Sequence, residues 1–259
     1  MKRCVSRGGC ALFVLALLAL TACNRKQVTS LEPPRNQEPF RSQSSQPHPK
    51  KGAAAANAAE PQPEATIDAG PNVGKFDFYV LALSWAPEFC ASHQDNRDAS
   101  ECDPSRHYGF VVHGLWPQNE DATYPVACTA ASPVANDLVR QVLPVMPARG
   151  LIQHEWATHG TCSGQSPQQY FSTMQRAFAN LKVPNEYQHS TQTAQASPKE
   201  IEQQFATANG APVDAFRVVC SKGDFIGVNV CLTKDLHYQG CGKALRECRA
   251  RQVTVLPAP

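Results

Sequence analysis

Residues 108–118 read Tyr-Gly-Phe-Val-Val-His-Gly-Leu-Trp-Pro-Gln. The first six are rich in aromatic and β-branched residues, which predicts a strand from Tyr108 to His113 and a turn that begins at Gly114. Upstream, the segment 76–84 alternates and is rich in β-prone residues, which predicts another strand that is largely buried. Both strands are expected to belong to the sheet of the domain.

Helices and further strands follow these two strands. Serine residues that precede proline indicate helix starts, because serine is favoured at the N-cap and proline at the first helical position. The expected helices are 132–146, a short one at 153–159, one from Ser166 and one from Ser197 to Gly210, and the segments 215–220 and 225–233 form an expected hairpin. Since no regular βαβ unit occurs, we predict the α+β class with a largely antiparallel sheet.

Residues 1–23 have the composition of an export signal. Positive residues precede an apolar run, 11–20, that is too short to span a bilayer as a stable helix. The run ends in Leu-Thr-Ala-Cys, the pattern of a bacterial lipoprotein signal in which Cys23 is lipidated and becomes the new N-terminus. An ordinary cleaved signal peptide is the alternative. We expect an exported protein, periplasmic or at the cell surface, and the Asn24 that follows favours tethering to an outer membrane.

The rest of the chain divides into a tether and a domain. Residues 24–74 are rich in Pro, Gln, Ser, Asn and Ala, so they bury too little apolar surface to offset the entropy of ordering and are predicted to be disordered. Residues 75–259 have the length of a single domain with its own core. The net charge of +2 is compatible with RNA binding through local patches and argues against a highly cationic duplex binder.

The predicted domain holds an even set of cysteines. They are Cys90, Cys102, Cys128, Cys162, Cys220, Cys231, Cys241 and Cys248. In an exported chain such a set predicts four disulfides, although eight cysteines allow 105 pairings. A structural zinc site is disfavoured because no Cys-x-x-Cys pair occurs among them.

A second histidine-rich segment, 154–162, reads His-Glu-Trp-Ala-Thr-His-Gly-Thr-Cys. Zinc proteases place two histidines at i and i+4 of a helix, whereas His154 and His159 are five residues apart. That spacing rotates the two side chains by well over 100° on a helix, so they would not share one face. A turn or helix end that brings several polar groups to one groove is expected instead, without a metal.

Histidines with a carboxylate and no metal suit acid–base chemistry near neutral pH, because one imidazole accepts a proton while another donates one. RNA needs such a pair: its 2′-hydroxyl loses a proton on attacking the adjacent phosphorus, and the leaving 5′-oxygen gains one. DNA has no 2′-hydroxyl and would be spared. The expected partner is therefore single-stranded RNA, with no cofactor.

The motifs His-Gly-Leu-Trp-Pro at 113–117 and His-Glu-Trp-x-x-His-Gly-Thr-Cys at 154–162 closely resemble the signatures of the ribonuclease T2 family. This family comprises secreted acid ribonucleases, among them plant S-type and bacterial periplasmic enzymes. The similarity extends from the region of Trp85 to Cys248. It implies an antiparallel sheet flanked by helices and a metal-independent endoribonuclease, expected as a monomer.

The resemblance also implies a role for each motif residue. His159 would activate the 2′-hydroxyl and His113 would protonate the leaving oxygen, and the reverse assignment within this pair is the alternative. His154 would bind the phosphate, and Glu155 would help to stabilise the phosphorane by hydrogen bonding. Trp116 would stack on the base upstream of the cut. The product would be a 2′,3′-cyclic phosphate, which is later hydrolysed to a 3′-phosphate.

Two departures from the family pattern bear on activity. Thr158 stands where many members carry a lysine that helps to neutralise the phosphorane, and Gln118 stands where some have an acidic residue in the base pocket. The base preference therefore cannot be carried over. The implied disulfides are Cys128–Cys162, Cys220–Cys248, Cys231–Cys241 and Cys90–Cys102.

Two other classes of function compete with a metal-independent ribonuclease. One is an inactive protein on the same fold that only binds RNA or a protein partner, which the change at Thr158 favours and the intact histidine set opposes. The other is a metal-dependent exported hydrolase, which the histidine spacing disfavours and chelator sensitivity would reveal. The sequence leaves the biological role open between scavenging of nucleotides and defence.

Overall fold

The computed structural model describes residues 72–93, 100–103 and 105–258. The predicted signal 1–23 with Cys23, and the predicted tether up to residue 71, lie outside the described residues. Residues 72–74, the last of the predicted tether, form a turn, and the Gly74 N–H donates to the Cys162 carbonyl oxygen at 2.9 Å. No helix in the described ranges is long and apolar enough to cross a membrane.

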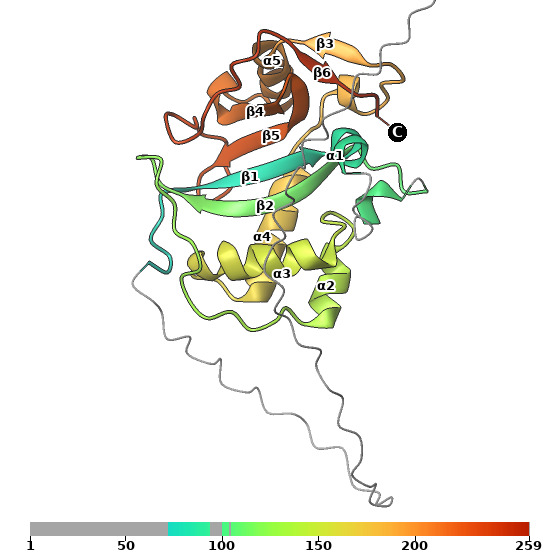
Figure 1. The fold of residues 1–259 in the computed structure, drawn as a ribbon. Coiled ribbons are helices and arrows are strands. Elements are labelled where there is room, and N and C mark those ends of the chain that lie inside the picture. Colours follow the sequence, from blue (N-terminus) through green and yellow to red (C-terminus); the bar gives the residue numbers. More distant parts are fainter. Residues whose placement is uncertain (1–71, 94–99, 104, 259) are drawn as a thin grey trace, which may run out of the picture. The chain divides into compact units, whose positions relative to one another are not determined.

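A six-stranded sheet forms the centre of the domain (Figure 1), in the order β2-β1-β5-β6-β3, with β4 also paired to β5. Its strands are β1 (Phe78–Trp85), β2 (Phe110–Gln118), β3 (Ala194–Ala196), β4 (Phe216–Ser221), β5 (Asp224–Leu232) and β6 (Val253–Val255). The pairings β1–β2, β1–β5, β4–β5 and β3–β6 are antiparallel, and β6 meets β5 in parallel. The predicted α+β class with a largely antiparallel sheet is confirmed.

Five α-helices accompany the sheet in the described residues. They are α1 (Ala86–Ser92), α2 (Asn136–Val142), α3 (Arg149–Thr158), α4 (Pro167–Asn180) and α5 (Pro198–Asn209). In Figure 1, α2, α3 and α4 lie on the β2 side of the sheet and α5 lies beside β4. Ser166 and Ser197 form the capping boxes that the sequence predicts, and Gly210 ends α5 with a φ of 59°.

The predicted helix at 132–146 is shorter than expected. It begins only at Asn136 and ends at Val142. The Gln153 side chain accepts from the Val134 N–H at 2.8 Å and donates to the Val134 carbonyl at 3.1 Å. Because both backbone groups of Val134 are bonded to a residue of α3, this segment stays extended, and the start signal at Ser132 is overridden by a tertiary contact.

The turn predicted at Gly114 is also wrong. Strand β2 continues through it, but its register against β1 shifts: Ala82 pairs with Gly114, and the next residue of β1, Leu83, pairs with Val112. His113 is therefore an extra residue, a β-bulge without a partner on β1. The Val112 N–H donates instead to the carbonyl of Val145, in the segment after α2, at 2.9 Å.

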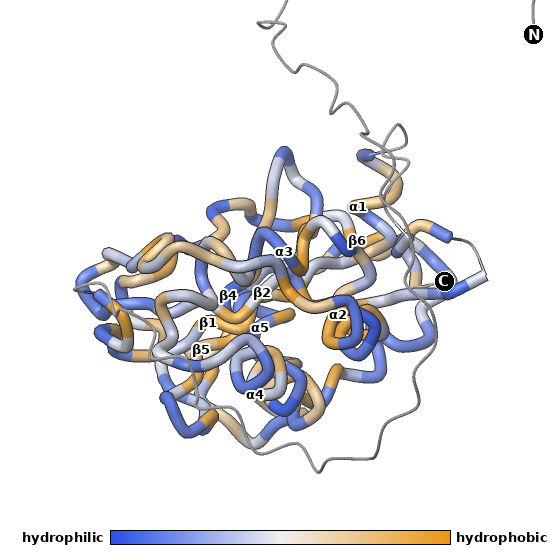
Figure 2. Tube along the Cα trace, turned by 90° about the horizontal axis from the view of Figure 1, so that it is seen from below, coloured by the Kyte–Doolittle hydropathy of each residue, from blue (hydrophilic) through white to orange (hydrophobic). Residues whose placement is uncertain are grey.

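The two faces of β1 pack into different apolar clusters. Tyr79, Leu81, Leu83 and Trp85 belong to the main core, which also holds most of the buried apolar residues of α3, α4 and α5. The alternate residues Phe78 and Val80 belong to a small cluster with Cys231 and Cys241. Figure 2 shows hydrophobic residues concentrated on the strands at the centre of the domain. Strand alternation thus makes β1 the wall between two clusters.

The structure contains the four implied disulfides. They are Cys90–Cys102, Cys128–Cys162, Cys220–Cys248 and Cys231–Cys241. The second of these ties the segment just after α3 to the loop that follows β2. It thus braces the helix end that carries the second histidine motif.

Replacing Gly227 by alanine is expected to destabilise the sheet. Gly227 lies in β5 opposite Ser84, and a Cβ there would overlap the carbonyl oxygen of Leu83. We expect the free energy of unfolding to fall by about 2 kcal/mol or more, because the backbones of β1 and β5 must move apart. Gly150→Ala is the matched control: it adds a Cβ with no neighbour within 4 Å on helix α3 and should leave stability equal or slightly higher. Urea titration of the oxidised proteins gives the comparison, and equal midpoints would contradict the assigned strand contact.

Candidate active site

The structure brings the five predicted site residues to one place from two elements. His113 and Trp116 lie on β2, His154 and Glu155 on α3, and His159 directly after the last helical residue. The Trp116 ring centroid is 5.6 Å from that of His113 and 5.5 Å from that of His159. The indole of Trp116 therefore lies close to both imidazoles of the predicted pair.

The end of α3 explains how residues five apart in the chain reach one site. The α-helix stops at Thr158, and His159 has a φ of −115° and a ψ of −42°, which turns the chain into a short 3-10 segment. The Thr158 carbonyl accepts from the Ala127 N–H at 2.8 Å, and the neighbouring Cys128–Cys162 disulfide holds the same loop. A helix end, rather than one helical face, thus presents His159, as the sequence predicts.

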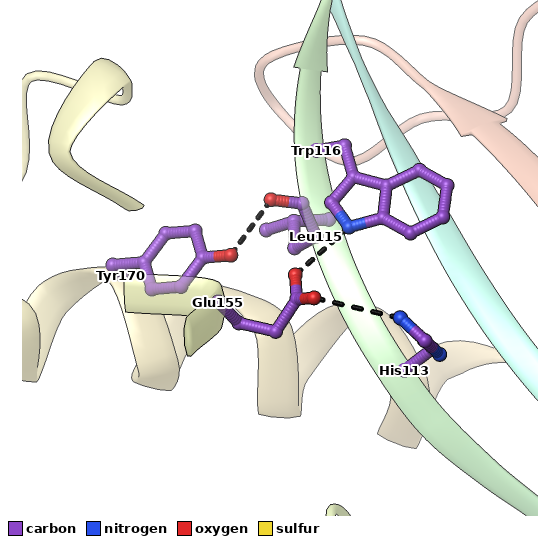
Figure 3. A network of polar contacts seen from close by, with 5 residues as sticks. All are labelled: His113, Leu115, Trp116, Glu155 and Tyr170. Carbon is purple, nitrogen blue, oxygen red and sulfur yellow. Dashed lines mark hydrogen bonds and ion pairs between the residues drawn. The ribbon is translucent and has the colours of Figure 1, made fainter. Parts of the chain in front are cut away.

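Glu155 is the buried centre of the site (Figure 3). Its side chain is 1% exposed, the Trp116 Nε1–H donates to Oε2 at 2.8 Å, and Oε1 lies 3.6 Å from His113 Nε2. Burial raises the pKa of Glu155 to about 7, against the lowering effect of the bond from Trp116. The carboxyl group thus connects Trp116 to His113 and titrates near neutral pH.

Gly114 makes room for this connection. A Cβ at Gly114 would overlap both Glu155 Oε2 and Trp116 Nε1.

On the next residue, the Leu115 carbonyl accepts from the Tyr170 hydroxyl of α4 at 2.9 Å (Figure 3). Burial raises the pKa of this tyrosine well above its ordinary value, so it remains a neutral donor. The Tyr170 hydroxyl thus holds the backbone of β2 at Leu115, between Gly114 and Trp116.

Both histidines of the pair have lowered pKa values in the free protein. Burial, then the charges of His154 and His113, lower the pKa of His159 to about 4. Burial and the charge of His154 also lower the pKa of His113, whose side chain is 45% exposed. Both imidazoles are therefore neutral at pH 7 in the absence of a negatively charged ligand.

Each histidine of the pair opens on its own cavity. His113 and His154 line a cavity of about 810 Å³ whose other walls come mainly from β2 and the start of α3. His159 and Trp116 line a second cavity of about 630 Å³. The remaining lining residues of the second cavity are Gln118, Ala122, Tyr124 and the four residues Lys243–Arg246.

Among the lining residues not anticipated from the sequence, three offer an aromatic surface or a charge. Tyr124 is 57% exposed, and a lone aromatic residue in the polar segment 119–124 was an available signal for it. Lys243 and Arg246 follow β5 by more than ten residues, and no local pattern places them beside the histidine motifs. Within the described ranges, no group of three or more His, Cys, Asp or Glu side chains is placed to hold a metal ion.

Comparison with known proteins adds the family. The model of the Ribonuclease T2 family matches residues 76–241. The chain belongs to this family. It is 39% identical over 122 residues to a "Probable ribonuclease" of Haemophilus influenzae, and 44% identical over 100 residues to a "Ribonuclease" of Aeromonas hydrophila. These alignments cover 42% and 39% of the chain, and 45% and 44% of the two relatives, so they span less than half of each relative.

A solved structure supports the fold independently. The RNase-related protein from Calystegia sepium superposes with a TM-score of 0.58 at 23% sequence identity. The superposition covers 70% of this chain and 97% of that protein. The ribonuclease T2 fold, implied by the two motifs, is therefore confirmed for the domain.

The raised pKa of Glu155 should be visible in stability. A carboxyl group whose pKa is about 7 in the folded state and ordinary in the unfolded state lowers stability as pH rises through this interval. Glu155→Gln removes this effect. The unfolding free energy of the variant minus that of the wild type should therefore increase by up to about 3 kcal/mol between pH 4.5 and 7.5.

Glu200→Gln serves as the control of opposite sign. Its carboxylate accepts from the Ser197 N–H at 2.8 Å, and this bond lowers the pKa of Glu200. For Glu200→Gln, the unfolding free energy of the variant minus that of the wild type should therefore decrease as pH rises through the acid range. A Glu155→Gln difference that is flat with pH would contradict the buried, protonatable carboxyl group.

Proposed function

We propose that the protein is a metal-independent endoribonuclease that cleaves single-stranded RNA by transphosphorylation. The observation that carries this proposal is the pair of imidazoles whose ring centroids both lie within 6 Å of that of Trp116, each imidazole opening on a separate cavity. An internal phosphodiester needs a base on one side and an acid on the other, with room for a nucleotide beyond each. Membership of the ribonuclease T2 family and the ribonuclease names of its relatives support the same activity.

His159 is assigned as the base and His113 as the acid. The neutral imidazole of His159 removes the proton of the 2′-hydroxyl, whose oxygen attacks the adjacent phosphorus. The P–O5′ bond breaks, and protonated His113 gives its proton to the leaving oxygen. The products are a 2′,3′-cyclic phosphate and a 5′-hydroxyl, and water later opens the ring to a 3′-phosphate.

Bound RNA would also adjust the protonation of the site. An anionic phosphate between the histidines favours the imidazolium form, so it opposes the burial that lowers the pKa of His113 and His159 in the free protein. His154 is exposed on the His113 side, where its cationic form would bind the phosphate. Protonated Glu155 would donate to a phosphoryl oxygen as negative charge develops there.

The assignment of base and acid gives the RNA a direction. The nucleotide that carries the attacking 2′-hydroxyl occupies the cavity beside His159, where Trp116 and exposed Tyr124 offer aromatic surfaces for its base. The leaving nucleotide occupies the cavity beside His113. Gln118 lies in the cavity beside His159, and its side-chain amide donates to the Thr123 carbonyl at 3.2 Å. An amide can both donate and accept hydrogen bonds, so Gln118 alone does not specify a base.

Location and assembly are part of the proposal. The four disulfides favour an oxidising compartment, and the pattern at Cys23 favours a lipoprotein tethered to a membrane. Export followed by action as a tethered monomer is therefore proposed, with the lipid at Cys23 as its membrane contact.

The activity is tested with the full-length oxidised protein on single-stranded RNA and matched DNA in excess EDTA. RNA should be cut to 2′,3′-cyclic phosphate ends and DNA spared. His113→Ala and His159→Ala should each lower kcat by roughly 10²- to 10⁴-fold, because each removes one proton transfer. His189→Ala, which changes an exposed histidine outside both cavities, should not. RNA that is bound but left whole from acid to neutral pH would favour the inactive-binder alternative, and a requirement for metal would favour a metal-dependent hydrolase.

Gly114→Ala should impair cleavage although it replaces no side chain of the site. The added Cβ forces Glu155 and Trp116 apart, so we expect kcat/KM for RNA to fall by about tenfold or more. Gly109→Ala, just before β2, adds a Cβ in ordinary contact with Trp85 at 3.4 Å and should retain activity. Equal activity of the two variants would show that the bond between Glu155 and Trp116 does not matter for catalysis.

A further inference from the structure

The cavity beside His159 has a cationic wall to which the proposed reaction assigns no role. Lys243 and Arg246 line it together with Trp116, and both are exposed. Within the described part of the chain, neither has a carboxylate within 4 Å. Neither lines the cavity beside His113. Two cations without an acidic partner therefore face the side of the site that would hold the upstream nucleotide.

The fold holds these two cations next to Trp116. The residues between them, Ala244 and Leu245, pack against the small cluster of Phe78, Val80, Cys231 and Cys241, and Trp116 packs against the same cluster. The segment and the indole thus share one apolar support. Lys243 and Arg246 flank the two packed residues of the segment. Their positions therefore depend on the same packing as the position of Trp116.

Covalent and polar contacts fix the segment further. Cys231–Cys241 joins it to β5 just before Lys243, and Cys220–Cys248 joins it to β4 just after Arg246. The Cys241 N–H donates to the Asp214 carbonyl at 2.8 Å. A segment closed by a disulfide at each end loses little conformational freedom when its side chains bind a ligand. Lys243 and Arg246 are therefore presented on a braced support rather than on a free loop.

The chemistry of this wall fits a phosphate. Paired cations beside aromatic surfaces are the combination that binds a nucleotide through its phosphate and its base. If the scissile phosphate lies between His113 and His159, the remaining phosphate of the upstream nucleotide is the one on its 5′ side. We propose that Lys243 and Arg246 bind this 5′-phosphate and so position the upstream nucleotide for cleavage. This inference rests on the proposed ribonuclease function.

The proposal is tested with a dinucleoside monophosphate, chosen from all base combinations as the one best cleaved, with and without a 5′-phosphate. For the wild-type full-length protein, the 5′-phosphate should lower KM about five- to tenfold. In the double variant Lys243→Gln/Arg246→Gln this ratio should fall to about one. The matched double variant Arg249→Gln/Arg251→Gln removes the same charge from exposed positions just beyond this segment, outside the cavity, and should keep the ratio.

A second measurement uses long single-stranded RNA. The slope of log kcat/KM against log salt concentration should be shallower in Lys243→Gln/Arg246→Gln by roughly 0.7 for each phosphate that the variant no longer neutralises, and should change less in the control.

A wild-type enzyme that is indifferent to the 5′-phosphate, or a variant that keeps the full ratio, overturns the proposal while leaving the ribonuclease function intact. A variant that loses kcat equally on both dinucleotides also overturns it, because the cations would then act on the scissile phosphate. A wild-type protein that cuts no RNA removes the proposed function and this inference together.

Discussion

The Glu155 carboxyl group, 1% exposed and bonded to the indole N–H of Trp116, is the contact on which the site depends. It joins α3 to β2, the two elements that carry the site residues, and it reaches to within 3.6 Å of His113. Removing a carboxyl group from water is unfavourable for its ionised form, so the pKa rises to about 7. Burial thus keeps this carboxyl group protonatable near neutral pH, beside His113.

Strand β2 can make this contact because it is irregular. The bulge at His113 shifts the register against β1, so the residues that follow no longer alternate in phase with those that precede it. His113 and Trp116, three residues apart, consequently lie with their rings 5.6 Å apart on the same site. In a regular strand, residues three apart point to opposite faces. The glycine between them then admits the Glu155 carboxylate where any larger side chain would block it.

The remaining architecture holds α3 and the C-terminal segment against this strand. One face of β1 packs the main core beneath α3 and α4, and the other supports Trp116 and the segment with Lys243 and Arg246. Two disulfides brace that segment and another braces the end of α3, so covalent bonds act together with this packing to fix the walls of the second cavity. The cavity beside His159 thus receives Lys243 and Arg246 from a braced segment, in a chain whose net charge is only +2.

Local chemistry determined much of this protein from its sequence alone. The capping boxes at Ser166 and Ser197 and the hairpin around Gly223 depend on neighbouring residues, and the two histidine motifs carry the family. The late start of α2, the bulge at His113 and the approach of Lys243 and Arg246 to Trp116 were decided by tertiary structure. Each depends on contacts between segments far apart in the chain, such as Gln153 with Val134 or Val112 with Val145. Such contacts leave no local pattern, because only the folded chain brings their partners together.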